Sequence, residues 1–221
     1  MRLLVVTAVE AERLAVARGL ARGGVEVLAA GVGMAAAAAS TARALATAPH
    51  PYDLVLSAGI AGGFDGRADL GATVLAARDV AADLGADSPD GFLSIDELGF
   101  GSSTVEVDAD ALARLRRALP DATVGDVLTV STVTGTAERV AALRSRHPDA
   151  VAEAMEGFGV ATAAALAGVP FAELRTISNP VGPRDRGAWR IREALDALGA
   201  AAARLAGSLP SASLPADSLE P

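Results

Sequence analysis

Short apolar, β-branched runs alternate along the chain with longer stretches that have helical spacing of apolar residues. The runs, bounded by turn residues, are typical of buried strands, and the stretches are typical of amphipathic helices. The expected strands cover residues 2–8, 25–30, 53–57, 72–77, 122–131 and 171–178. The expected helices cover residues 10–22, 34–48, 108–119, 136–146, 155–167 and 186–205. This alternation predicts a three-layer αβα fold around a central, mixed sheet.

No internal repeat or linker divides the core, so residues 1–206 are expected to form a single domain. Residues 83–107 are expected to be a long loop with strand fragments, and long loops in compact domains are often functional. Residues 207–221 are rich in Ser, Pro and Ala and are expected to form a disordered tail.

The composition excludes several classes of function. Lys and Arg total 19 and Asp and Glu total 27, which gives a net charge of −8. A chain this acidic has a poor electrostatic basis for binding nucleic acid or anionic membranes, and its scattered charges favour a small-molecule partner. With no cysteine, disulfides, thiolate metal sites and cysteine nucleophiles are excluded.

The two histidines, His50 and His147, both lie in expected turns. A Ser–His–Asp triad or a histidine metal site is therefore not expected, and neither is a metal or cofactor. Glu10 and Glu12 interrupt the first apolar run too early for a secretory signal. The Ala-rich stretch 34–46 is too short and too weakly apolar to span a bilayer. We therefore expect a cytoplasmic protein with no membrane partner.

Polar or glycine-rich segments follow several expected strands, where ligands bind in α/β sheets. Glu10 and Glu12 follow the first strand; one of them could deprotonate water, or both could simply stabilise a helix N-terminus. The glycines of 59–63 could bring backbone N–H groups to a ligand or form a tight turn. Their spacing is not that of a dinucleotide-binding loop.

Met155 and Glu156 open an expected helix. A carboxylate can accept hydrogen bonds from both hydroxyls of a ribose, and a methionine can pack on the sugar or base. The alternative is a helix-terminal charge beside a core methionine. Ser178 and Asn179 end a buried strand before a turn with two prolines, which could also be only a turn.

Taken together, these segments resemble the purine nucleosidase and phosphorylase family, and most closely its methylthioadenosine/S-adenosylhomocysteine nucleosidases. The matching segments are Glu10-Ala-Glu12, Gly31-Val-Gly33, Gly59-Ile-Ala-Gly-Gly63, Met155-Glu156 and Ile177-Ser-Asn179. The resemblance covers residues 1–206 and implies that Glu12 activates water, Glu156 binds the ribose hydroxyls and Asn179 binds the leaving base. It further implies substrate contacts from Ala61, Gly62, Gly135, Thr136, Met155 and Ser178. Members are often homodimers, and the loop with Phe92 and Phe100 is the expected contact.

One departure concerns the base. The adenine-cleaving nucleosidases have Asp where this chain has Asn179. A side-chain amide offers one donor for a purine O6 and one acceptor for N7–H, which favours a 6-oxopurine such as hypoxanthine. A mismatched buried polar group costs about 1–3 kcal/mol, enough to set selectivity. Because Asn cannot deliver a proton, the proton source for the leaving base stays open.

A second departure concerns the 5′ side of the nucleoside. The string from Ile177 to Trp189, with residues 83–85 and 91–100, resembles one hydrolase branch of the family whose substrate carries a benzoate. Arg184 or Arg186 could pair with that carboxylate bidentately, or both could be solvated turn residues.

Three other functions compete. A phosphorylase of the same family would need a cation for phosphate, usually in the loop after the second strand, and residues 31–35 contain none. A non-catalytic nucleotide sensor leaves the paired carboxylates unexplained. A dinucleotide-dependent oxidoreductase lacks the glycine spacing it needs.

Overall fold

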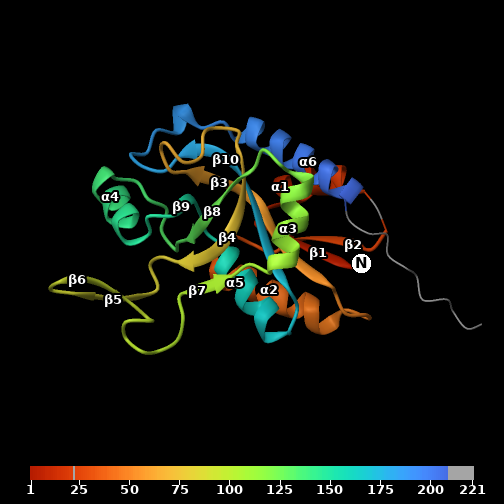
Figure 1. The fold of residues 1–221 in the computed structure, drawn as a ribbon, viewed down its shortest axis with the longest axis horizontal. Helices are drawn as coiled ribbons and strands as arrows, with labels where there is room; N and C mark the ends of the chain where they lie inside the picture. Colours follow the sequence, from red (N-terminus) through yellow and green to blue (C-terminus); the bar gives the residue numbers. More distant parts are fainter. Residues whose placement is uncertain (22, 209–221) are drawn as a thin grey trace, which may run out of the picture.

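A mixed β-sheet with helices on both sides organises the chain (Figure 1). The structure, a computed structural model, describes residues 1–21 and 23–208. Its strands are β1 (Leu3–Thr7), β2 (Val25–Ala29), β3 (Leu54–Gly63), β4 (Thr73–Ala81), β5 (Gly85–Ser88), β6 (Gly91–Ser94), β7 (Thr104–Glu106), β8 (Thr123–Thr129), β9 (Ala150–Ala154) and β10 (Phe171–Pro180). Its helices are α1 (Glu10–Gly19), α2 (Met34–Thr47), α3 (Ala109–Ala118), α4 (Ala137–Arg146), α5 (Gly157–Leu166), the 3-10 helix η1 (Arg186–Ala188) and α6 (Ile191–Ser208).

The main sheet has the strand order β10-β4-β8-β9-β3-β1-β2, with β7 paired to β4. Because β10 also pairs with β3, the five strands from β3 to β10 close on themselves, and β1 and β2 continue outward from β3. The pairings β1–β2, β1–β3, β3–β10, β4–β8 and β8–β9 are parallel, whereas β3–β9, β4–β7 and β4–β10 are antiparallel. The expected mixed α/β architecture is confirmed.

The helices form two groups. α1 and α3 pack against α6, and α2 packs against α5 on the other side of the sheet (Figure 1). The second contact is unusually close, because a Cβ added at Gly159 would lie 2.2 Å from the carbonyl oxygen of Met34. Only a glycine permits this approach, which brings the first turn of α2 next to the first turn of α5.

Most expected elements are present, with β1, β2 and α2 within two residues of their expected ends. Asp108 caps α3 as expected, since its carboxylate accepts a hydrogen bond from the Ala111 N–H at 2.8 Å. Three expectations are wrong. Strand β9 was not expected at all, and the helix expected from 186 divides into η1 and α6. Strand β3, expected to end at 57, continues to Gly63 through glycines for which a tight turn was one alternative.

Helix α6 continues to Ser208, two residues into the segment expected to be a tail. The rest of the tail expected from residue 207, residues 209–221, lies outside the described residues. Within the described residues, none of the helices combines the length and apolar content needed to cross a bilayer.

Candidate active site

A cavity of about 480 Å³ opens where β3, β9 and β10 end and β1 leads into α1. The pairing of β3 explains its position. On one edge, β3 pairs with β1 through Leu54–Ser57 and then with β9 at Gly62 and Gly63. Between these pairings, residues 58–61 pair with no strand of the described chain on this edge, which leaves room for other groups.

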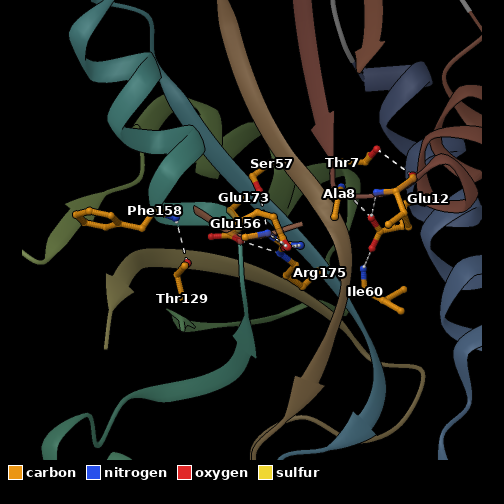
Figure 2. Close-up of polar contacts among 12 residues, drawn as sticks. Thr7, Ala8, Glu12, Ser57, Ile60, Thr129, Glu156, Phe158, Glu173 and Arg175 are labelled. Carbon is orange, nitrogen blue, oxygen red and sulfur yellow. Dashed lines mark hydrogen bonds and ion pairs between the residues drawn. The ribbon is translucent and has the colours of Figure 1, made fainter. Parts of the chain in front are cut away.

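Glu12 occupies that gap. Its Oε1 accepts a hydrogen bond from the Ile60 N–H at 2.9 Å, and its Oε2 accepts from the N–H groups of Ala8 at 2.9 Å and Val9 at 3.2 Å (Figure 2). The residue is 3% exposed. Three backbone donors therefore fix this carboxylate in one orientation at the wall of the cavity.

Glu156 lies directly before α5 and is 7% exposed. Its Oε1 accepts from the Gly33 N–H at 3.1 Å, and its Oε2 is 3.6 Å from Nη1 of Arg175. Burial raises the pKa of Glu156, against the opposing effects of Arg175 and the Gly33 N–H, and nearby Glu12 raises it further. Glu12 and Glu156 therefore lie in different settings, one held by three backbone N–H groups and the other beside a guanidinium.

Arg175 connects these carboxylates to the interior of the sheet and is 1% exposed. Its Nε donates to Oε1 of Glu173 at 2.7 Å, and its Nη2 donates to Oγ of Ser57 at 3.0 Å (Figure 2). Burial by itself would lower the pKa of Arg175, but Glu173, Glu156 and Glu12 outweigh burial and raise it. Arg175 is therefore the cation that balances the buried acids.

A further buried acid, Asp79, lies near Glu173. It accepts a hydrogen bond at 2.7 Å from the hydroxyl of Thr129, which in turn accepts from the Phe158 N–H at 3.0 Å in α5. Burial first, and then the Glu173 carboxylate, raise the pKa of Asp79 well above its ordinary value. Burial and the neighbouring Glu173 carboxylate therefore both favour the neutral form of Asp79.

Gly157 is essential to this arrangement. A Cβ there would lie 1.8 Å from Oδ2 of Asp79 and 2.5 Å from Oε1 of Glu173. The two acids therefore occupy the space that any other residue at 157 would fill.

Asn179 lies near the end of β10, where it pairs with Gly62 of β3. Its Nδ2 donates to the carbonyl of Pro180 at 3.0 Å. The hydroxyl of Ser178 lies 2.8 Å from Oδ1 of Asn179 and 3.2 Å from the carbonyl of Ala61. The hydroxyl has one proton, which it can donate either to Oδ1 of Asn179 or to the carbonyl of Ala61. Donation to Oδ1 holds the Asn179 amide with its oxygen toward Ser178.

The structure brings most of the expected site residues to one cavity. Its lining includes Glu12, Ala61, Gly62, Gly135, Met155, Glu156, Ser178, Asn179 and Arg184. Thr136 and Arg186 are exceptions and do not belong to the lining. The Thr136 hydroxyl caps α4 by accepting from the Arg139 N–H at 3.2 Å, and the Arg186 guanidinium lies 5.9 Å from the centre of the Trp189 ring.

Several functional candidates were missed. Glu153 and Trp189 line the cavity, and Arg175, Glu173 and Asp79 support it. The sequence does contain a signal for one pair. Glu173 and Arg175 lie two apart in an otherwise apolar strand, so their side chains share a face, and opposite charges there indicate an internal ion pair.

The chain belongs to the phosphorylase superfamily, whose family model matches residues 6–211. It is 55% identical to the futalosine hydrolase of Streptomyces coelicolor over 230 aligned positions, which cover 96% of this chain and 97% of that one. It is 37% identical to the futalosine hydrolase of Thermus thermophilus, with 85% and 84% of the two chains covered.

Solved structures agree on the fold. An S-adenosylhomocysteine nucleosidase from Streptococcus pyogenes, in complex with 5-methylthiotubericidin, superposes with a TM-score of 0.82 at 19% identity, covering 95% of this chain and 98% of that one. The futalosine hydrolase of Helicobacter pylori superposes with a TM-score of 0.80 at 17% identity, with coverage of 95% and 98%. The family expected from the sequence motifs is confirmed.

Proposed function

We propose that this chain hydrolyses the N-glycosidic bond of futalosine, releases hypoxanthine and leaves dehypoxanthine futalosine, as a step of menaquinone biosynthesis. One observation carries the proposal: Glu12, Glu156 and Asn179, far apart in the sequence, line one cavity. The chain that holds them is 55% identical, over almost its whole length, to a futalosine hydrolase.

Hydrolysis of an N-glycoside passes through an oxocarbenium-like sugar, so the enzyme must deliver water to C1′. Glu12 is the group for this task. Its carboxylate is held by three N–H groups at the wall of the cavity, which orients its remaining acceptor position toward a water. As the water attacks, Glu12 takes its proton as general base.

Glu156 binds the ribose hydroxyls. The Gly33 N–H occupies one of its oxygens and Arg175 is near the other, and each oxygen keeps a further lone pair for a hydroxyl. Met155, beside it in the lining, packs on the sugar or base. This arrangement holds C1′ in place for the water that Glu12 activates.

Asn179 selects the base. In one orientation its amide donates to the O6 of hypoxanthine and accepts from N7–H, and Ser178 holds that orientation by donating to Oδ1. An adenine would place its amino group against the amide N–H groups. This mismatch accounts for a preference for 6-oxopurines.

Arg184 and Trp189 take the benzoate. Both line the cavity, and the Arg184 guanidinium lies 5.7 Å from the centre of the Trp189 ring. Among the lining residues that the structure describes, Arg184 is the only cation. We therefore assign the carboxylate to Arg184, with bidentate pairing, and the benzoate ring to the face of Trp189.

The decisive experiment is to incubate the protein with futalosine, inosine and methylthioadenosine in phosphate-free buffer and identify the freed base. We expect hypoxanthine from futalosine at the highest kcat/KM. Release that requires added phosphate would favour the phosphorylase, and adenine from methylthioadenosine as the main product would favour an adenine nucleosidase. Binding without any release would favour the nucleotide sensor.

The homodimer and the cytoplasmic location remain predictions from the sequence. Phe100 supports the first, because its side chain is 83% exposed in the long loop. Phe92 is a weaker candidate for a partner contact, because the Arg146 guanidinium covers its ring at 4.3 Å. Light scattering of the wild type and of Phe100→Ser would test the dimer, which the substitution should weaken.

A further inference from the structure

Base release requires a proton that the residues assigned so far do not supply. When the C1′–N9 bond breaks, its electron pair moves onto the purine, and protonation at N7 stabilises the leaving base. The amide of Asn179 has no proton that it can give up. Glu12 receives a proton from water in the same step and cannot also be the donor.

Among the acidic residues in the described strands of the main sheet, Glu153 is the one that lines the cavity. It lies in β9, lines the cavity and is 6% exposed. Glu153 pairs with Gly62 on one side, and Gly62 pairs with Asn179 on the other. The three residues therefore form one row across β9, β3 and β10, with Gly62 in the middle.

The side chains of this row lie on the same face. A Cβ at Gly62 would be 3.3 Å from Nδ2 of Asn179, so the amide lies over the face on which that Cβ would stand. Residues directly paired in neighbouring strands project to one face, which places Glu153 there too. Two strand spacings, about 10 Å, separate the outer strands. Because Gly62 has no side chain, the Asn179 amide lies above it together with Cγ2 of Val181, which a Cβ at Gly62 would meet at 2.9 Å. The amide is therefore about one strand spacing from β9, so Glu153 and Asn179 can face the same edge of a bound purine.

The surroundings of Glu153 suit an acid that gives up a proton and is then stabilised. Burial raises its pKa, and the hydrogen bonds from Thr134 oppose that rise; Arg139 also opposes it, whereas Asp83 adds to it. The Thr134 N–H lies 2.8 Å from Oε1, and the Thr134 hydroxyl lies 2.5 Å from Oε2. After proton transfer, both Thr134 donors point at the new carboxylate.

We propose that Glu153 is the catalytic acid that protonates the leaving purine. The oxygen of water bonds to C1′ as the C1′–N9 bond breaks and its electron pair goes to the purine. The proton of Oε2 of Glu153 goes to N7, Oδ1 of Asn179 then accepts a hydrogen bond from the new N7–H, and Glu12 takes the proton of the water. Exchange with solvent then restores both groups. This inference rests on the function proposed above.

The test is Glu153→Gln, which keeps the size of the side chain and an acceptor for the Thr134 N–H but has no transferable proton. We expect kcat to fall on the order of 10²–10⁴-fold with little change in KM. The wild-type rate should fall at high pH as Glu153 loses its proton, and the variant should lack this high-pH decrease. Glu106→Gln, an exposed position on β7, is the matched control and should behave as wild type.

A kcat and a pH profile of Glu153→Gln equal to wild type would overturn the proposal. If this variant does not fold, Glu153→Asp decides instead, because it keeps an acid. Glu153→Asp should retain the decrease in rate at high pH, with a lower kcat. Loss of that decrease in Glu153→Asp would contradict the proposal. Each assay uses futalosine and inosine. If the wild type turns over normally and the variant is unaffected, only the role of Glu153 is refuted. If the wild type releases no base from either substrate, both proposals are refuted.

Discussion

Replacing Arg175 with methionine removes the only guanidinium in contact with Glu173 within the described structure, and the size of the effect can be worked out. Glu173 is completely buried, and Nε of Arg175 lies 2.7 Å from its Oε1. Without the cation, the stranded carboxylate must take a proton for the chain to stay folded. At pH 7, protonating a glutamate of ordinary pKa about 4.3 costs roughly 3.7 kcal/mol, at about 1.4 kcal/mol for each pH unit.

This loss is a large part of the roughly 5–15 kcal/mol that stabilises a typical domain. It is also pH-dependent, because the folded variant holds a proton that the unfolded chain releases above pH 4.3. The destabilisation therefore grows by about 1.4 kcal/mol for each pH unit above 4.3 while the folded variant keeps its proton, from about 1 kcal/mol at pH 5 to about 3.7 kcal/mol at pH 7. Urea unfolding of wild type and Arg175→Met at pH 5, 6 and 7 measures it.

The matched control is the double variant Arg175→Met/Glu173→Leu, which removes the stranded charge together with its partner. Replacing a buried ion pair by apolar residues of similar volume is often close to neutral. The double variant should therefore be more stable than Arg175→Met and should lose the pH dependence. A single variant that loses less than about 1 kcal/mol at pH 7, or whose loss is the same at all three pH values, would refute the reasoning.

Three further predictions test neighbouring parts of the site. Asn179→Asp should shift the ratio of kcat/KM from inosine toward adenosine by roughly tenfold or more, since about 1–3 kcal/mol separates matched from mismatched groups; an unchanged ratio would exclude Asn179 from base selection. Glu156→Ala should remove most of the preference for inosine over 2′-deoxyinosine, and a preference kept in full would mean that another group binds the hydroxyl. Gly157→Ala should lower the thermal midpoint by several degrees, because its Cβ would lie 1.8 Å from Oδ2 of Asp79, and Asp79→Asn, which keeps a neutral side chain there, should lower it less.

The sequence predicts the architecture well where hydrophobic patterning is strong. The apolar run at the first strand and the Asp108 cap give correct elements. Strand β9 was missed because alanine and glutamate have low strand propensity, and only its burial between β8 and β3 makes it a strand. For a similar reason, β3 was expected to end before its glycines. They remain extended because β10 and β9 pair with them, which is tertiary information.

The residues of the candidate site were likewise only partly predicted from the sequence. Glu12, Glu156 and Asn179 were found because polar residues at strand ends, matched to family motifs, indicate a ligand site. Asp79 was not found, because its importance depends on Glu173, which is far away in the sequence. Thr136 and Arg186 were also predicted for the site, but neither lines the cavity. Thr136 caps α4, and Arg186 lies at the Trp189 ring, which the lining residue Arg184 also approaches.

The three hydrogen bonds that Glu12 accepts limit how many water molecules its carboxylate can bind. An ionised carboxylate has about four acceptor positions, and three N–H groups already use three of them. One position is left, so the carboxylate can hold a single water rather than a cluster. If Glu12 is the general base proposed above, backbone amides thus select the attacking nucleophile before any nucleoside binds.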